Sequence, residues 1–295
     1  PQRAAFGMVL ALAEILRRAV EVQYDHNTVS YRPELYASAG GELLVVAMLL
    51  SWALTAVYRP DTIASNPLQD RVGYNNLCVG WDMAPARYVA APLFGLIIWF
   101  ENRYMMLDFW RASLTPGLSK VKENIVLVAN FLNAVSWTFA CLIFVIQADE
   151  WPAGHTAAFV QKVVFGYIAY VANFIETDES THRTGSWVFL GLFGIVSSGF
   201  FCCAFVQFQF YDELTNTPGP IPWFVTAGFD YSWFACLVVQ GFMRPRAPDI
   251  ICALSLRLHD GSELSVLQAE VASVAGFGAV AKAAVTPPGS RPFAP

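Results

Sequence analysis

The stretch WVFLGLFGIVSSGFFCCAFVQFQF, residues 187–210, decides the fold class, because it contains no Asp, Glu, Lys or Arg. A helix of about 20 apolar residues is long enough to cross the roughly 30 Å hydrocarbon core of a bilayer. The whole sequence shares this bias, with 56% hydrophobic and only 14% charged residues, against roughly 25% charged residues in an average soluble domain. The composition predicts an all-α integral membrane protein and excludes a soluble enzyme, a disordered scaffold and a secreted disulfide domain.

Five further apolar windows resemble residues 187–210 in length. The six predicted spans are 42–58, 87–104, 123–147, 155–176, 187–210 and 222–243. An even number of crossings puts both termini on one side of the membrane. Lys and Arg gather on that side, whereas Arg59, Arg71 and Arg87 lie on the other, so both termini are expected to face the cytosol or the matrix or stroma of an organelle.

The predicted bundle divides the chain into three segments: an N-terminal segment 1–40, the six-helix transmembrane domain 41–243 and a C-terminal extramembrane tail 244–295. Residues 4–22 are apolar at first and then charged, which predicts an amphipathic helix lying in the membrane interface, with a short extra crossing as the alternative. Residues 59–86 are rich in Pro, Asn, Asp and Gly, and they predict a structured cap on the side opposite the termini.

The tail carries the signature of a short hairpin. Leu254, Leu256 and Leu258 alternate with polar residues before Asp260-Gly261, with 262–266 as the return strand. A helix over 264–274 competes for some of the same residues.

Two ionisable residues fall well inside predicted spans, where a charge costs several kcal/mol unless it is paired or faces a cavity. They are Lys162 and Asp230, and their distances from the preceding loops put them at nearly the same depth. We expect them to approach each other, as a structural ion pair that fixes helix packing or as part of a proton relay, with the structural role favoured. Glu101, Arg103 and Glu176 lie at predicted span ends, where their side chains are expected to reach the head groups.

Small residues in the span 187–210 indicate close helix contacts. Gly191, Gly194 and Ser198 have the spacing that lets membrane helices approach each other. The pattern favours a compact bundle over a water-filled channel.

No other chemistry is indicated by the sequence. The six cysteines lack C-x-x-C spacing, and the four histidines lack a zinc-binding pattern. Because no nucleophile, base or metal constellation can be assembled, we expect no enzymatic activity, no metal and no cofactor, with bound membrane lipids as the expected ligands. A net charge of −5 without a basic run argues against a nucleic-acid partner.

Residues 133–170, NAVSWTFACLIFVIQADEWPAGHTAAFVQKVVFGYIAY, place an acidic loop before a histidine that opens the next helix. The pattern, with the acidic and aromatic residues that begin at Asp230, resembles the damage-regulated autophagy modulator family over about 80–243. The family-like residues are Asp82, Pro85, His155, Gly166 and Tyr170. The resemblance implies a six-span membrane protein that works without catalysis in trafficking, autophagy or lipid organisation, although the N-terminal extension and the long tail depart from the family.

We expect a non-catalytic accessory subunit of a large organellar membrane complex of the respiratory or ATP synthase type. Because the sequence starts at Pro1 without an initiator methionine, it is expected to be a mature product that has lost a targeting segment. The expected location is the mitochondrial inner membrane with both termini in the matrix, and the expected partners are other subunits and membrane lipids. The alternatives are a plastid complex, an endomembrane lipid-organising protein of the autophagy modulator type, and a proton-coupled carrier that uses Lys162 and Asp230.

Overall fold

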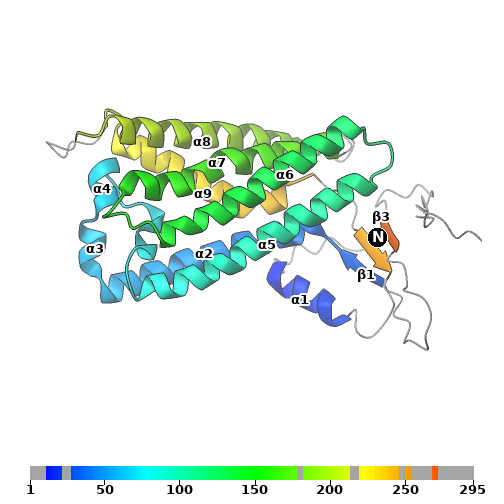
Figure 1. The fold of residues 1–295 in the computed structure, drawn as a ribbon, viewed down its shortest axis with the longest axis horizontal. Coiled ribbons are helices and arrows are strands. Elements are labelled where there is room, and N and C mark those ends of the chain that lie inside the picture. Colours follow the sequence, from blue (N-terminus) through cyan, green and yellow to red (C-terminus); the bar gives the residue numbers. More distant parts are fainter. Residues whose placement is uncertain are drawn as a thin grey trace, which may run out of the picture.

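The structure, a computed structural model, describes residues 11–21, 28–177, 182–212, 219–245, 247, 250–253 and 268–271. Over these ranges the long helices lie side by side in an elongated bundle (Figure 1). The long helices are α2 (Pro33–Tyr58), α5 (Ala86–Leu114), α6 (Lys120–Ala140), α7 (Pro152–Glu176), α8 (Thr184–Gln209) and α9 (Trp223–Met243). Helices cover most of each predicted span.

Four helical stretches are long and apolar enough to cross a membrane. They are α2, the stretch Lys120–Phe144 formed by α6 and the 3₁₀ turn η2 (Cys141–Phe144), α7 and α8. These four helices indicate an integral membrane protein.

Helix α5 continues beyond residue 104, the predicted end of the second span, and ends at Leu114. The expectation that Glu101 and Glu176 reach the head groups is wrong, since their exposed fractions are 2% and 8%. Charged residues in this part of the chain pair with one another inside the bundle and therefore do not mark a helix end.

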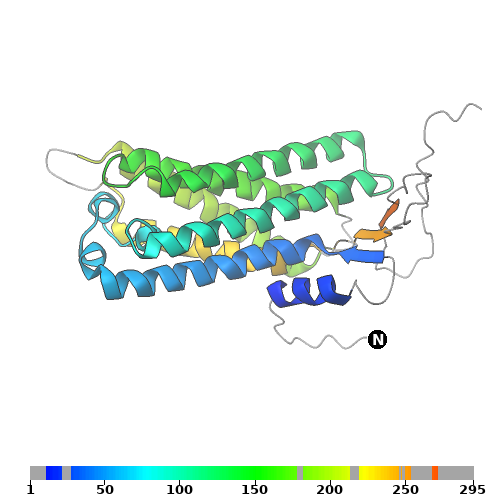
Figure 2. The same cartoon turned by 60° about the horizontal axis from the view of Figure 1, so that its bottom comes forward.

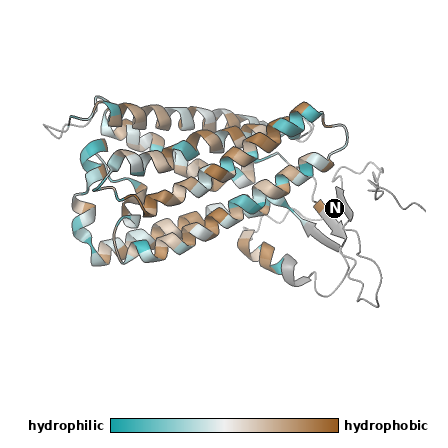
Figure 3. Cartoon of the chain, in the orientation of Figure 1, coloured by the Kyte–Doolittle hydropathy of each residue, from teal (hydrophilic) through white to brown (hydrophobic). Residues whose placement is uncertain are grey.

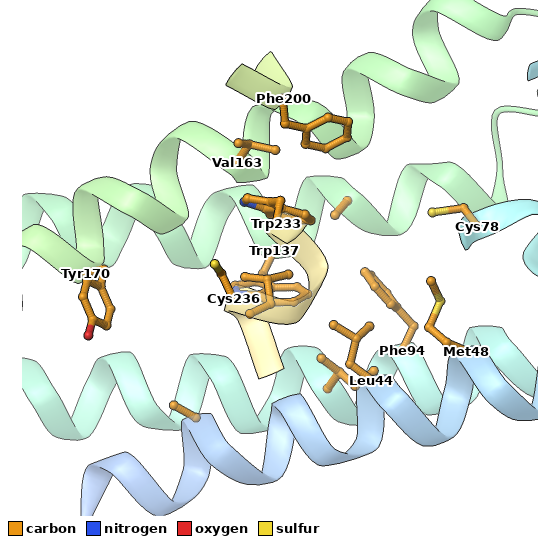
Figure 4. Packing of buried hydrophobic residues seen from close by; sticks show 14 of the residues in the cluster. Leu44, Met48, Cys78, Phe94, Trp137, Val163, Tyr170, Phe200, Trp233 and Cys236 are labelled. Carbon is orange, nitrogen blue, oxygen red and sulfur yellow. The ribbon is translucent and has the colours of Figure 1, made fainter. Parts of the chain in front are cut away.

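The centre of the bundle is filled by aromatic side chains that come from different helices (Figure 4). The ring centroids of Phe94 and Trp137 are 5.8 Å apart, and Trp233 contacts Phe159 edge to face at 5.4 Å. Large apolar side chains are exposed on the outside, such as Leu49 at 68%, and hydrophobic residues recur along the long helices (Figure 3). Such an outer face fits a lipid environment.

A cap covers one end of the bundle and includes most of residues 59–86. Its elements are α3 (Pro60–Ala64), α4 (Pro67–Val72) and η1 (Leu77–Trp81). Asn66 caps α4 by accepting a hydrogen bond from the amide of Gln69 at 2.9 Å. Gly73 ends α4 with φ 79°, a left-handed conformation that favours glycine. A Cβ atom at this position would also collide with Trp223 at the start of α9.

The N-terminal helix α1 (Ala11–Glu21) lies beside α2 (Figure 2). The carboxylate of Glu42 accepts hydrogen bonds from the amides of Ala11 at 2.6 Å and Leu12 at 3.2 Å, which favours the helix start electrostatically. The remainder of the predicted helix 4–22, residues 4–10 and 22, lies outside the described residues.

A small antiparallel sheet joins a strand that precedes the bundle to two strands that follow it. Strand β2 (Ile250–Ala253) pairs with β1 (Thr28–Tyr31) on one side and β3 (Gln268–Val271) on the other. The predicted hairpin strands, 254–258 and 262–266, lie outside the described residues. The competing helix over 264–274 is wrong at Gln268–Val271, because these residues form a strand.

Candidate functional site

The most unusual feature of the bundle is a buried charge cluster at the end opposite the cap. The guanidinium of Arg111 binds Glu34 of α2 at 2.5 Å, Glu176 of α7 at 3.0 Å and Asp108, one turn away on α5. All four side chains are less than 10% exposed. We call these four residues the Arg111 cluster; it connects three helices through one cation.

Amide side chains bind a further oxygen of this cluster, Oδ2 of Asp108. Asn130 of α6 and Asn173 of α7 donate hydrogen bonds to Oδ2 of Asp108 at 3.0 and 2.9 Å. The hydroxyl of Tyr104 donates to Oδ1 of Asn173 at 2.8 Å. Because buried polar atoms are costly without partners, these contacts stabilise the charges that α5 brings into the bundle.

Arg244, the residue directly after α9, completes the network. It donates to the hydroxyl of Tyr104 and to Oδ1 of Asn173, and its guanidinium lies 4.1 Å from the Tyr104 ring centroid. The ring of Tyr170, one of the family-like residues, lies at 5.4 Å from the same guanidinium. The ends of α2, α5, α7 and α9 are therefore fixed to one another.

Lys162 lies deeper in the bundle and is 1% exposed. Its Nζ atom donates to Oδ1 of Asn133 on α6 at 2.7 Å and lies 4.5 Å from the Trp137 ring, while Glu101 of α5 attracts it electrostatically. Gly166 makes room for the ammonium group, because a Cβ atom at that position would lie 2.6 Å from Nζ. Gly166 thus has a structural role one turn from Lys162.

Asp230 lies at the capped end of the bundle. Its Oδ2 atom accepts hydrogen bonds from the hydroxyl of Tyr74 and from Nδ2 of Asn76, both at 3.0 Å. The predicted pair of Lys162 with Asp230 is wrong, because each group has its own partners. Counting residues from the preceding loops does not determine the direction in which a side chain points around its helix axis.

Asp82 and His155, two family-like residues, do come together. Nε2 of His155 lies 3.6 Å from Oδ1 of Asp82, and Nδ1 lies 2.7 Å from the carbonyl oxygen of Ile146. Burial raises the pKa of the Asp82 carboxyl to about 7. Pro85 follows three residues later and forms a cis peptide bond with Ala84.

The predicted contact face of α8 is correct in one of its three positions. A Cβ atom at Gly194 would lie 2.5 Å from the hydroxyl oxygen of Tyr167 on α7, so the glycine allows this approach. Gly191 and Ser198 are exposed on the outer face. Gly199 is the second close approach, against the ring of Phe229 on α9.

The sequence analysis missed the Arg111 cluster, although Asp108 and Arg111 carry a signal. Opposite charges three residues apart share a helix face and can pair along it. Among the described residues, no group of three His, Cys, Asp or Glu side chains could hold a metal ion.

No protein-family model, no curated protein and no solved structure matches this chain. The resemblance to the damage-regulated autophagy modulator family therefore stays a prediction from sequence.

Proposed function

We propose that this protein is a non-catalytic accessory subunit of a larger membrane assembly. In this proposal six helices cross the bilayer: the four candidate spans described above, together with α5 and α9. The terminal segments bind neighbouring subunits on one side of the membrane. The observation that carries the proposal is that an N-terminal and a C-terminal strand join in one sheet, next to the end of the bundle that holds the Arg111 cluster.

The sheet is anchored to the bundle through its central strand. Ile250 of β2 is fully buried and packs in one cluster with Leu107 of α5, the residue before Asp108. Tyr31 of β1 and Tyr36 of α2 pack against the same pair. The segments outside the bundle are therefore held in place by packing where they leave it. Segments held in this way can present a defined surface to other subunits.

The outer strands of this sheet suit the binding of a partner. In the described residues β1 and β3 each pair on one side with β2. An outer strand has a row of backbone groups that an extended segment of another chain can bind.

The proposed location is the mitochondrial inner membrane with both termini in the matrix, with a plastid or endomembrane location as alternatives. The support is the concentration of Lys and Arg on the terminal side of the bundle. Bound lipids and other subunits are the proposed ligands and partners.

The alternative of a proton-coupled carrier built on a pair of Lys162 and Asp230 has lost its premise, because these groups bind different partners. The alternative of a lipid-organising protein gains support from a cavity between α7 and α8, which is described below.

Co-purification tests the subunit proposal. The tagged chain is purified in mild detergent beside two shortened variants, one ending at residue 247 and one ending at residue 271. We expect the chain to run in a complex with partners in fixed ratio. The variant that ends at 247 is expected to lose these partners while its bundle stays folded, with a melting temperature lowered only by the loss of the buried Ile250. The variant that ends at 271 retains β2 and β3 and is the matched control. A monodisperse monomer from the full chain, or unchanged partners after removal of both strands, contradicts the proposal.

A further inference from the structure

A cavity of about 250 Å³ lies between α7 and α8 in the half of the bundle near the cap. Small side chains on α7, Ala153, Thr156 and Ala157, face Phe205 and Phe208 of α8. Because the lining is nearly all apolar and both helices are apolar enough to cross a membrane, the groove opens toward lipid hydrocarbon. We call it the α7–α8 groove.

A second, smaller cavity of about 40 Å³ lies inside the groove and under the cap. The four residues that line both cavities are Thr156, Val160, Ala204 and Phe208. The two cavities are therefore adjacent, and we call the inner one the chamber. Its lining differs from that of the groove, because it includes the polar side chains of Tyr74, Asn76, His155 and Thr226.

One polar atom of the chamber is weakly satisfied within the protein. Oγ1 of Thr226 is buried, the residue is 1% exposed, and the neighbouring thiol of Cys203 is its one weak partner among the described residues. Three other polar side chains of the chamber are in use: Tyr74 and Asn76 bind Asp230, and His155 contacts the carbonyl of Ile146. A buried hydroxyl whose only partner is a weak thiol gains free energy when a ligand hydroxyl binds it.

The size and charge of the chamber limit what can enter it. A space of about 40 Å³ accepts a group of one or two heavy atoms, since a water molecule needs about 10–15 Å³ on this scale. The lining of the chamber contains no Lys or Arg, and the Asp230 carboxyl group lies behind Tyr74 and Asn76. The chamber thus holds no cation to balance an anionic head group, which favours a small neutral one.

We propose that the α7–α8 groove and the chamber bind one neutral single-chain amphiphile from the membrane, with its alkyl chain in the groove and its terminal hydroxyl hydrogen-bonded to Thr226. The apolar groove holds the alkyl chain of the amphiphile between α7 and α8. The chamber supplies the polar contact that orients the molecule. This arrangement of apolar walls and few polar groups is typical of small-molecule sites in proteins.

Photolabelling tests the proposal. The full chain is placed in phosphatidylcholine nanodiscs and exposed to a long-chain alcohol that carries a diazirine in its chain and a terminal alkyne. We expect labelled peptides from residues 153–161 and 201–208. The unlabelled alcohol is expected to compete for this site, whereas an alkane and a carboxylate of the same chain length are not.

Two variants test the two parts of the site. Ala157→Trp fills the groove from an exposed position and is expected to abolish site-specific labelling, whereas the matched control Ala53→Trp, on the exposed face of α2, leaves it unchanged. Thr226→Val removes the hydroxyl and is expected to weaken competition by the alcohol about fivefold, as the loss of one hydrogen bond predicts.

Three results overturn the proposal. Labelling spread over all outer helix faces indicates partition into the bilayer without a site. Equal labelling of Ala157→Trp and Ala53→Trp, whether high or low in both, shows that the groove does not control binding. Equal competition by the alcohol and the carboxylate contradicts recognition of a neutral hydroxyl.

Discussion

The Nε2 atom of His155 lies 3.6 Å from Oδ1 of Asp82, which joins the first turn of α7 to the residue that follows η1. Arg87 and Asp149 act on the same carboxyl group, Arg87 lowering and Asp149 raising its pKa. Burial outweighs these charges and raises the pKa of Asp82 to about 7, from the ordinary value near 4. The contact holds the cap against the bundle, and the shifted pKa makes this part of the fold sensitive to pH.

Asp82→Asn is expected to remove a pH dependence of stability. Between pH 4 and 7 the folded protein keeps the Asp82 proton that the unfolded chain releases, so the free energy of unfolding falls as the pH rises through this range. The shift corresponds to about 1–4 kcal/mol lost between pH 4 and pH 8. Thermal unfolding in detergent across this pH range measures it. Asp61→Asn, at an exposed carboxyl of the same cap, is the matched control and should keep the wild-type slope; a slope that persists in Asp82→Asn contradicts the prediction.

Arg111→Met is expected to destabilise the bundle strongly. Removing the cation leaves Glu34, Asp108 and Glu176 buried without a counter-charge, which costs about 3–5 kcal/mol. The control is Arg59→Met, because Arg59 pairs with Asp61 on the exposed surface of the cap and its loss should leave the melting temperature unchanged. Similar melting temperatures for both variants would show that the Arg111 cluster does not hold the helix ends together.

Lys162→Met and Asp230→Leu are expected to have additive effects on stability. The two groups have separate partners, so a double-mutant cycle should give a coupling of less than about 0.5 kcal/mol. Lys162→Met and Asn133→Leu, in contrast, remove two sides of one 2.7 Å hydrogen bond and should couple by about 0.5–3 kcal/mol. Chemical unfolding of the single and double variants measures both cycles, and strong coupling of Lys162 to Asp230 would restore the sequence-based pair.

Gly194→Ala and Gly191→Ala form a matched pair on α8. The new Cβ atom at Gly194 would push against the Tyr167 ring, so this variant should lose about 1–3 kcal/mol of stability. At Gly191 no atom lies within 4 Å of the added Cβ, and alanine should stabilise the helix by up to about 1 kcal/mol. Equal melting temperatures would show that α7 and α8 do not approach each other at Gly194.

The long helices could be predicted from the sequence because continuous apolar runs, such as residues 187–210, carry their own signal. The end of α5 could not, because Asp108 and Arg111 interrupt the apolar run after residue 104. Their partners Glu34 and Glu176 lie 77 and 65 residues away from Arg111, and no local pattern connects them. Contacts at such separations depend on which helices become neighbours in the bundle.

The contact of Asp82 with His155 shows the opposite case. Both residues belong to the family resemblance, and both lie at the capped end of the bundle, Asp82 directly after η1 and His155 in the first turn of α7, so the topology brings them together. The partner of Lys162 was predicted wrongly from depth alone. Rotation about the helix axis turns its side chain toward Asn133 on α6.

The position of Arg244 determines how mechanical load enters the molecule. Its guanidinium is tied to Tyr104 on α5 and Asn173 on α7 directly after the last helix. A pull on the C-terminal segment acts first on β3 and β2. Once these strands separate, the force reaches the contact between α5 and α7 through Arg244, and the last turn of α9 is shielded from unwinding.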